Sequence, residues 1–350
     1  MRKMLYLILM VSLPLLLLTA CDVHEWPDTP ELVKFHLRMN YESYMTKWNH
    51  QYNGACVVET SMGETYDNHL PYGNIRYIIR AYPALGKDRI SQKHAYEFIF
   101  VKSISEGYDY GVTLELPGGD YNIMVWSDML QYTNDTYFYN TENFSEIMLQ
   151  GDYVGNSDYR DAFRGRGPIS LVADIIDQAP DTFDITMQRP LAKYEFVTTD
   201  LEEFIDKEIE YWTEMAATRG DVPPTRINTD EYNVVLYFSG YMPSAYNMNS
   251  DKPVDSKMGV LFNSKLEVLS ENEASLGFDY VFVNEKKSAV IVQLGLYDKE
   301  DREIALTEPI NVPLQRSHHT VIKGSFLMQH VLGGITINPD FNGNHNIVID

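Results

Sequence analysis

Residues 112–126 read VTLELPGGDYNIMVW and give the clearest structural signal in the chain. Val112–Leu116 and Tyr121–Trp126 are alternating runs of apolar and polar side chains, the period of a half-buried β-strand. The four residues between them, Pro117–Asp120, contain two glycines and suit a tight turn. The stretch therefore predicts a β-hairpin.

Short runs of the same kind recur along the chain, separated by turn residues. The 25 Tyr and 15 Phe, together with Val and Ile in alternating positions, favour strands over helices. Further strands are expected at residues 31–39, 75–82, 96–102, 169–173, 182–188, 193–198, 233–238, 259–262, 278–283, 289–297, 310–314 and 319–327. Many short antiparallel strands with turns between them are typical of β-sandwiches, so the sequence predicts a mainly all-β fold.

Two stretches lack this pattern. Residues 48–74 are polar and rich in turn formers, which predicts a long loop. Residues 128–168 are polar and rich in tyrosine. Because that is long for a structureless connection, we expect part of it to pack or to form a contact surface.

A domain boundary is expected near residue 190. Pro190 has no N–H to donate to a strand ladder and restricts Arg189, so one continuous central strand is disfavoured here. The alternation restarts at Lys193. We therefore predict an N-terminal β-sandwich over residues 31–189 and a C-terminal one over residues 190–350.

One amphipathic helix is expected in the second domain. Thr199 and Glu202 have the spacing of a capping box, and Gly220 is a typical helix stop. Between them one face is apolar and contains Leu201, Phe204, Ile205, Ile209, Trp212 and Ala216.

The first residues predict export and lipid attachment. Arg2 and Lys3 precede an apolar run that is too short for a comfortable membrane span, so residues 1–20 are expected to be a signal peptide. Leu-Thr-Ala-Cys at residues 18–21 resembles a bacterial lipobox, in which Cys21 is acylated and becomes the first mature residue. The alternative is a secreted protein with a chance cysteine there. Residues 21–30 are expected to form an acidic tether.

Charge and cysteine content narrow the function classes. The chain has 28 Lys plus Arg and 50 Asp plus Glu, a formal net charge of −22. Without the two basic residues of the leader the charge is −24, which would repel nucleic acid and anionic membrane surfaces. With Cys21 committed to lipid, Cys56 stands alone in an expected loop and no disulfide can form within the chain.

Candidate metal sites are weak. His318 and His319 are adjacent, so on a strand they point to opposite faces. The segment with Asp340, Asn342 and Asn344 differs from an EF-hand loop, because its glycine is at another position and the final glutamate is missing. It fits a turn better. A calcium loop at Asp152, Asn156, Asp158 and Asp161 is a minor alternative in so acidic a chain.

The sequence contains none of the common catalytic motifs. The sequence has no nucleophile elbow, zinc-protease motif, phosphate loop or dinucleotide fingerprint. Trp48, Trp126 and Trp212 have rings that can stack on sugars, although Trp126 and Trp212 also fit core positions. We therefore expect no catalytic residue, no metal and no cofactor.

Three segments carry a resemblance to a known family. They are LPGGDYNIMVWSD at residues 116–128, MQRPLAKYEF at 187–196 and RSHHTVIKGSFL at 316–327. With the lipobox leader they resemble the fimbrial anchor lipoproteins of Bacteroidales, of the FimB and Mfa type. The resemblance implies two transthyretin-like β-sandwich domains and a place at the base of a surface fimbria. Polymerising subunits of such fimbriae are cut after an arginine. Arg38 and Arg80 are candidates here, although an anchor needs no such cut.

The tail is a candidate donor strand. Ile335 and Ile337 alternate with polar residues, and Ile347, Val348 and Ile349 form a β-branched run. Such a segment can add to the open edge of a partner's sheet, or it can complete the second sandwich. Both interpretations stay open at this point.

These observations predict a non-enzymatic component of a fimbrium-like assembly or of cell adhesion. We expect it at the outer membrane, held through the N-terminal lipid, on the cell surface, with fimbrial subunits as partners through β-strand addition. The alternative is a surface lipoprotein that binds glycans or another ligand, which the tyrosine-rich stretch would suit.

Overall fold

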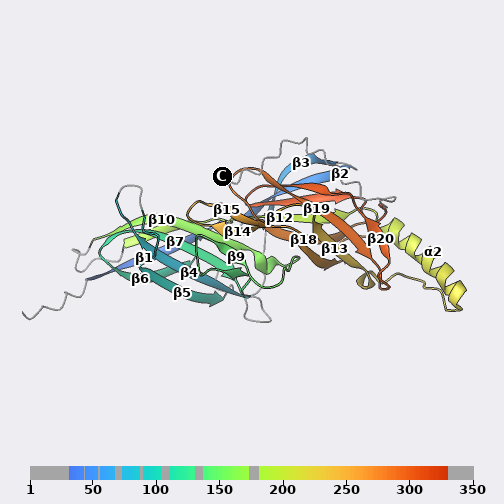
Figure 1. The fold of residues 1–350 in the computed structure, drawn as a ribbon, viewed down its shortest axis with the longest axis horizontal. Helices are drawn as coiled ribbons and strands as arrows, with labels where there is room; N and C mark the ends of the chain where they lie inside the picture. The colour runs from blue at the N-terminus through green and yellow to red at the C-terminus, as the bar shows by residue number, and fades with distance from the viewer. Residues whose placement is uncertain are drawn as a thin grey trace, which may run out of the picture.

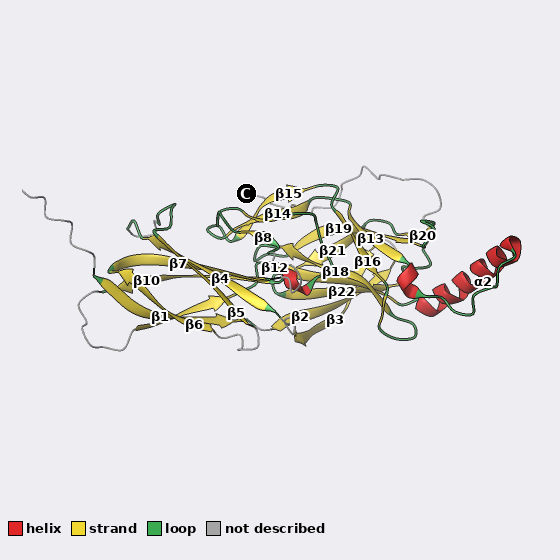
Figure 2. Cartoon of the chain, turned by 90° about the horizontal axis from the view of Figure 1, so that it is seen from below, coloured by secondary structure: helices red, strands yellow, loops and turns green. Residues whose placement is uncertain are grey.

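The structure is a computed structural model. It describes residues 31–42, 44–53, 56–67, 73–86, 90–103, 110–130, 137–172 and 181–329. The molecule is elongated, with β1 and β6 at one end and helix α2 projecting from the other (Figures 1 and 2).

The first sandwich lies at the β1 end of the molecule. One sheet has the order β11 (Asp181–Met187), β1 (Leu32–Tyr41), β6 (Tyr110–Pro117). The facing sheet has the order β10 (Ala162–Leu171), β7 (Gly119–Met129), β4 (Asn74–Pro83), β5 (Tyr96–Ser103). Alternate side chains of both sheets fill the space between them, among them Phe35, Leu37, Ile79, Ile123 and Val125. Their burial explains why the apolar period of two was visible in the sequence.

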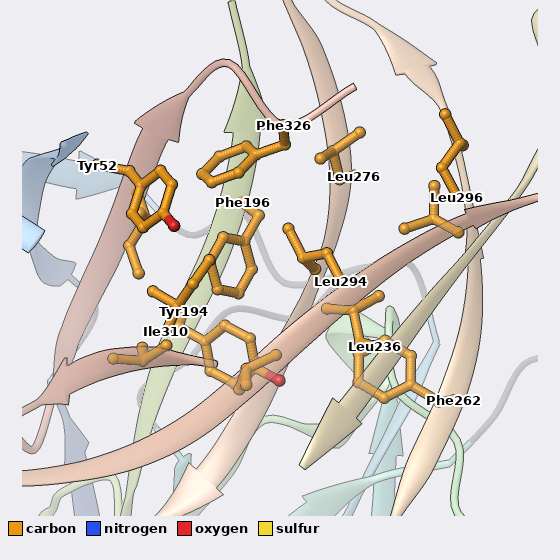
Figure 3. Packing of buried hydrophobic residues seen from close by; sticks show 14 of the residues in the cluster. Tyr52, Tyr194, Phe196, Leu236, Phe262, Leu276, Leu294, Leu296, Ile310 and Phe326 are labelled. Atoms are coloured by element: carbon orange, nitrogen blue, oxygen red, sulfur yellow. The ribbon is translucent and has the colours of Figure 1, made fainter. Parts of the chain in front are cut away.

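The second sandwich is larger. Its first sheet has the order β17 (Glu267–Val268), β18 (Ala274–Phe282), β12 (Leu191–Thr198), β22 (His318–Gly324), β2 (Tyr44–Asn53), β3 (Cys56–Asp67). The facing sheet contains β16 (Leu261–Lys265), β13 (Asn233–Phe238) and β19 (Ser288–Tyr297), followed by β20 (Glu303–Leu306) and β21 (Ile310–Leu314), which both pair with β19. Figure 3 shows the core between the sheets, where the rings of Tyr52 from β2 and Phe326 lie 5.2 Å apart.

A third cluster of buried residues joins the two sandwiches. A small sheet of β15 (Lys252–Lys257), β14 (Met242–Asn247), β9 (Ile147–Leu149) and β8 (Tyr139–Asn140) lies beside the first sandwich. Trp126 of β7, Tyr139, Tyr246 and Phe282 of β18 pack in one hydrophobic cluster there. The cluster confirms that part of the tyrosine-rich stretch packs. It also includes Trp126, which is fully buried, as its strand position predicted.

Helix α2 (Leu201–Arg219) ends as predicted but begins differently. Gly220 follows it in the left-handed region at φ 76° and donates its N–H to the Ala216 carbonyl, so the stop signal is confirmed. The predicted Thr199–Glu202 capping box is wrong, because the N-cap residue is Asp200 and makes no side-chain cap bond. Its carboxylate accepts instead from the backbone N–H of Met328 at 3.0 Å. The helix start is thereby tied to the segment after β22.

The fold-class prediction is confirmed, whereas the predicted hairpin and one predicted loop are wrong. The chain is mainly β, with two tandem sandwiches and one α-helix in the second, as far as the described residues extend. Strand β6 pairs with β1, and β7 pairs with β4 and β10, so the turn at Pro117–Asp120 connects two facing sheets and forms no hairpin. The loop expected at residues 48–74 instead contains most of β2 and all of β3. The register of this pair shifts between Lys47 and Asn49 and again before His50. Such bulges break the alternation of buried side chains, so the stretch does not read as a strand.

Among the described strands, pairing crosses the predicted domain boundary in two places. Strand β2 runs parallel to β22, and β9 pairs with β14. Both β2 and β9 precede residue 190, yet each pairs with a strand that follows it. The boundary therefore remains a prediction about which residues fold independently.

Gly165 of β10 provides a test of the first sandwich. A Cβ at Gly165 would lie 2.5 Å from Ile185 Cγ2 and 2.6 Å from Met187 Sδ, whereas at Gly167 the nearest atom is 3.9 Å away. We expect Gly165→Ala to lower the free energy of unfolding by about 1–3 kcal/mol through overpacking. Gly167→Ala is the matched control and should change it little. Equal effects in urea titrations would contradict this packing of β10 on β11.

Candidate functional site: the strand slot of β1 and the ion-paired junction

Strand β1 fills a slot between two strands that come later in the chain. Residues 35–41 pair in parallel with residues 181–187 of β11, and residues 32–39 pair antiparallel with residues 110–117 of β6. Phe35, Leu37 and Met39 point into the core and are fully buried. Two complete ladders and three buried side chains therefore hold this N-terminal strand.

The outer face of β1 is polar. Lys34 Nζ lies 3.3 Å from Glu115 of β6, and Arg38 Nε donates to Asp184 of β11 at 2.5 Å. Hydrogen bonds from Arg38 and Asn40 lower the pKa of Asp184. Exposed pairs of this kind contribute little to stability, so their main effect is to favour this register of β1.

Neither candidate arginine for a maturation cut lies in an exposed loop, where proteolysis concentrates. Arg38 lies in the middle of β1 and is paired on both sides. Arg80 of β4 is buried, with Nε 2.5 Å from Glu97 and its guanidinium 4.1 Å from the centroid of the Phe144 ring. The structure thus gives no support to a cut at either residue.

Open sheet edges occur in both sandwiches. No described strand pairs with the outer edge of β5, whose Ile99 and Val101 side chains are 57% and 53% exposed. In the second sandwich, β20 and β21 pair with different parts of β19 and together form one edge of that sheet. Leu306 of β20 donates to the carbonyl of Gln329, the last described residue. Unpaired backbone groups on an edge are a template for strand addition.

The junction between the sandwiches contains buried ion pairs. Arg160 pairs with Asp279 of β18, and both are almost fully buried. The guanidinium also donates to the carbonyls of Tyr280 at 2.9 Å and Val154 at 3.0 Å, and the Tyr153 hydroxyl donates to Asp279. Burial raises the pKa of Asp279 to about 6, and Arg160 opposes that rise.

Arg189, at the predicted boundary, belongs to a second buried pair. Its Nε lies 2.9 Å from Asp161, and its guanidinium lies 4.4 Å from the centroid of the Phe163 ring. Its Nη1 donates to the Glu42 carbonyl at 3.2 Å, and the Ser317 hydroxyl donates to the Glu42 carboxylate. The segments after β1, after β11 and before β22 are therefore held at one point.

A third group centres on Asp251, in the turn between β14 and β15. Arg316 Nη1 lies 3.0 Å from its carboxylate, and Arg164 of β10 pairs with the same group. The Tyr246 hydroxyl also donates to it. Hydrogen bonds from Arg316 and Tyr246 outweigh burial and lower the pKa of Asp251.

The three segments that carry the family resemblance meet at this junction. They contribute Trp126 and Asp128, Arg189 and Lys193, and Arg316, all buried. Their acidic partners Asp158, Asp161 and Asp251 could not be assigned from the sequence, because the pairs join distant parts of the chain. The only sequence signal for these buried pairs was the presence of basic residues within otherwise apolar strands.

The sequence-derived metal candidates have other roles. Lys193 lies 2.8 Å from Asp158 and Arg189 binds Asp161, so the proposed calcium loop instead supplies counter-ions. His319 Nε2 lies 3.1 Å from Glu195, and burial lowers the pKa of His319. Within the described part of the chain, no group of three His, Cys, Asp or Glu side chains could hold a metal ion. The candidate turn at residues 340–344 lies outside it.

Several predicted residues also lie outside the described residues. They are the lipidation candidate Cys21 and the strand-donor candidates Ile335, Ile337, Ile347, Val348 and Ile349. Cys56 was expected in a loop but is the first residue of β3. The ring of Trp48 lies 4.1 Å from that of His318 on the second sandwich.

Among the described residues, no helix has the length and apolar character to span a bilayer.

Comparison with known proteins gives similar folds at low sequence identity. The fimbrial anchor protein Mfa2 from Porphyromonas gingivalis is 13% identical, with 78% of this chain and 82% of that chain covered and a TM-score of 0.35. The tip fimbrial protein Mfa3 from the same organism is 9% identical, with 81% of each chain covered and a TM-score of 0.36. A fimbrial assembly protein from Parabacteroides distasonis is 12% identical, with 83% and 91% covered and a TM-score of 0.34.

These likenesses concern the fold alone. No curated protein matches the sequence. A match to the family described as "Family of unknown function (DUF6562)" extends over residues 32–350, nearly the whole chain. The chain therefore belongs to the DUF6562 family.

Proposed function

We propose that this protein is a non-enzymatic component of a fimbrium-like surface assembly. In this proposal it is held at the outer membrane by lipid on Cys21 and is joined to neighbouring subunits by β-strand addition. The observation that carries the proposal is the position of β1. An N-terminal strand occupies the centre of a three-stranded sheet with three fully buried side chains.

A filled slot suits a subunit at the end of an assembly. While β1 remains in place, both β6 and β11 are paired and the slot between them has no room for a partner's strand. Because this slot is filled, we propose that the chain joins a neighbouring subunit by donating a segment. The alternating residues 335–337 and the β-branched residues 347–349 make the tail the best candidate, since backbone bonds supply affinity and alternate side chains supply specificity.

The membrane part of the proposal rests on Cys21. Two or more acyl chains hold a protein on a bilayer far more firmly than one, because each buried CH₂ contributes about 0.8 kcal/mol. We expect Cys21→Ala to abolish labelling by a fatty-acid analogue and to shift the protein from the membrane pellet to the soluble fraction. Cys56→Ala is the matched control and should change neither. A Cys21→Ala variant that stays in the pellet would refute lipid anchoring.

The assembly part is tested by recovering the protein with its neighbours. Cells would be treated with a chemical cross-linker, and the protein would then be immunoprecipitated from their detergent-solubilised membranes. The proposal expects a β-sandwich subunit to be recovered in a fixed ratio, linked to the tail of this chain. Recovery of this protein alone, with or without cross-linker, would contradict it.

A further inference from the structure

A pocket of about 320 Å³ lies at the α2 end of the molecule. It is enclosed by the C-terminal half of α2, the segment that returns from Asp221 to Tyr232, and the turn at Lys299 and Glu300. Trp212 and Tyr232 belong to its lining. Its volume is at the lower end of the range of about 300–1,000 Å³ that is typical of small-ligand sites.

A buried carboxylate fixes the aromatic side chains of this pocket. Glu208 of α2 accepts hydrogen bonds from Trp212 Nε1 at 3.2 Å and from the Tyr232 hydroxyl at 2.9 Å. Arg302 neutralises Glu208 through contacts of 2.7 and 2.9 Å to its two oxygens. Asp298 in turn accepts from Arg302 at 2.8 Å. The two rings are thus held in place before any ligand arrives, which lowers the entropic cost of binding.

The loop that closes the pocket is also restrained. Pro223 and Pro224 fix two successive φ angles in the segment that returns along the helix. At the rim Arg219 binds Glu300 through contacts of 2.9 and 3.1 Å, and Lys299 Nζ lies 2.7 Å from Glu231. These features give the pocket a defined shape in the unliganded protein.

The charges around the pocket indicate the class of ligand. Its lining contains three cationic side chains, Arg219, Arg226 and Lys299, and three anionic ones, Asp221, Glu231 and Glu300. The lining is therefore neutral in a chain of net charge −22. Ionic ligands gain little from a balanced lining, and an apolar ligand would strip water from six charged groups. A neutral ligand with many hydroxyl groups can use both signs of charge as hydrogen-bond partners and pack its apolar face on Trp212.

We infer that this pocket binds a neutral carbohydrate, with one or two sugar rings against Trp212 and the hydroxyl groups facing the charged rim. The site is separate from the β1 slot, because α2 lies at the end of the molecule opposite to β1 (Figure 2). It would add ligand recognition to that role.

The inference is tested with neutral mono-, di- and trisaccharides of glucose, galactose, mannose, xylose and N-acetylglucosamine. Binding to the full chain is measured by saturation-transfer NMR and calorimetry, with sialyllactose as a charged probe. We expect saturable binding of at least one neutral sugar, with weaker binding of the charged probe. Trp212→Ala should weaken the binding at least about tenfold. If no neutral sugar shows saturable binding, the inference fails.

Two further variants keep this test decisive. Arg226→Ala removes an exposed rim side chain and leaves the aromatic side chains in place, so it should weaken binding several-fold even if Trp212→Ala does not fold. Tyr241→Ala removes an aromatic side chain that is 59% exposed outside the pocket, and should change nothing. Unchanged binding in Arg226→Ala, or an equal loss in Tyr241→Ala, would overturn the inference.

Discussion

Replacement of Asp279 by alanine is expected to lower the free energy of unfolding by about 3–5 kcal/mol. The change leaves the Arg160 guanidinium buried at the junction without its carboxylate partner. It also removes the acceptor of the Tyr153 hydroxyl. Because the pair joins the loop before β10 to β18 of the second sandwich, the junction should loosen before either sandwich unfolds. Urea unfolding followed by circular dichroism and by tryptophan fluorescence measures both effects.

The matched control is Glu300→Ala. Glu300 pairs with Arg219 at the surface, where both side chains are more than 40% exposed. Exposed pairs contribute about 0–1 kcal/mol, so this variant should unfold close to the wild type. If Asp279→Ala costs no more than Glu300→Ala, the junction is hydrated and does not join the two sandwiches rigidly.

The strands that could be predicted are those with a regular burial pattern. The strands expected at residues 112–116 and 121–126 are present as β6 and β7, and the alternation of β1 places Phe35, Leu37 and Met39 in the core. The hairpin predicted for β6 and β7 is wrong, because the two strands belong to facing sheets and do not pair. In β1 and β6 one face is buried and the other is more exposed, so their sequences have a period of two. Strand β7 is buried on both faces after its first residues. The C-terminal end of α2 was equally predictable from the sequence, because the residue after it adopts the left-handed conformation, which favours glycine.

The parts that could not be predicted depend on contacts between distant residues. Strand β2 has few buried side chains and two register shifts, and its parallel partner β22 begins more than 260 residues later. Nothing local marks such a pairing. The buried pairs are similar: in the sequence Asp161 was a minor candidate for calcium binding, and nothing local indicated its pairing with Arg189. Trp212 fitted a core face by its helical spacing but lines a surface pocket, because the loop at residues 221–232 folds back beside it.

Removal of residues 345–350 is expected to abolish recovery of a partner subunit and to leave the thermal stability of the protein unchanged. The segment carries Ile347 and Ile349 on one face of a strand and Val348 on the other. Burying one isoleucine contributes roughly 1.5–3 kcal/mol, so loss of two in a partner's groove weakens binding at least about a hundredfold. The double variant Ile347→Asp, Ile349→Asp should reproduce the deletion.

Val348→Asp is the matched control for that double variant. It places a charge on the opposite face of the same strand, so the apolar contacts of Ile347 and Ile349 are retained. We expect recovery of the partner to fall less than in the double variant. Equal losses in both would indicate that the segment does not bind as a strand with one buried face.

The most direct measurement of the proposed role compares the full chain with the chain ending at residue 344, in the same cells and under the same cross-linking. For each, the melting temperature and the amount of β-sandwich subunit recovered from membranes are measured. The account predicts an unchanged melting temperature with recovery reduced to background. A lowered melting temperature with undiminished recovery would contradict it, because the tail would then be a resident strand of the second sandwich and not a donated one.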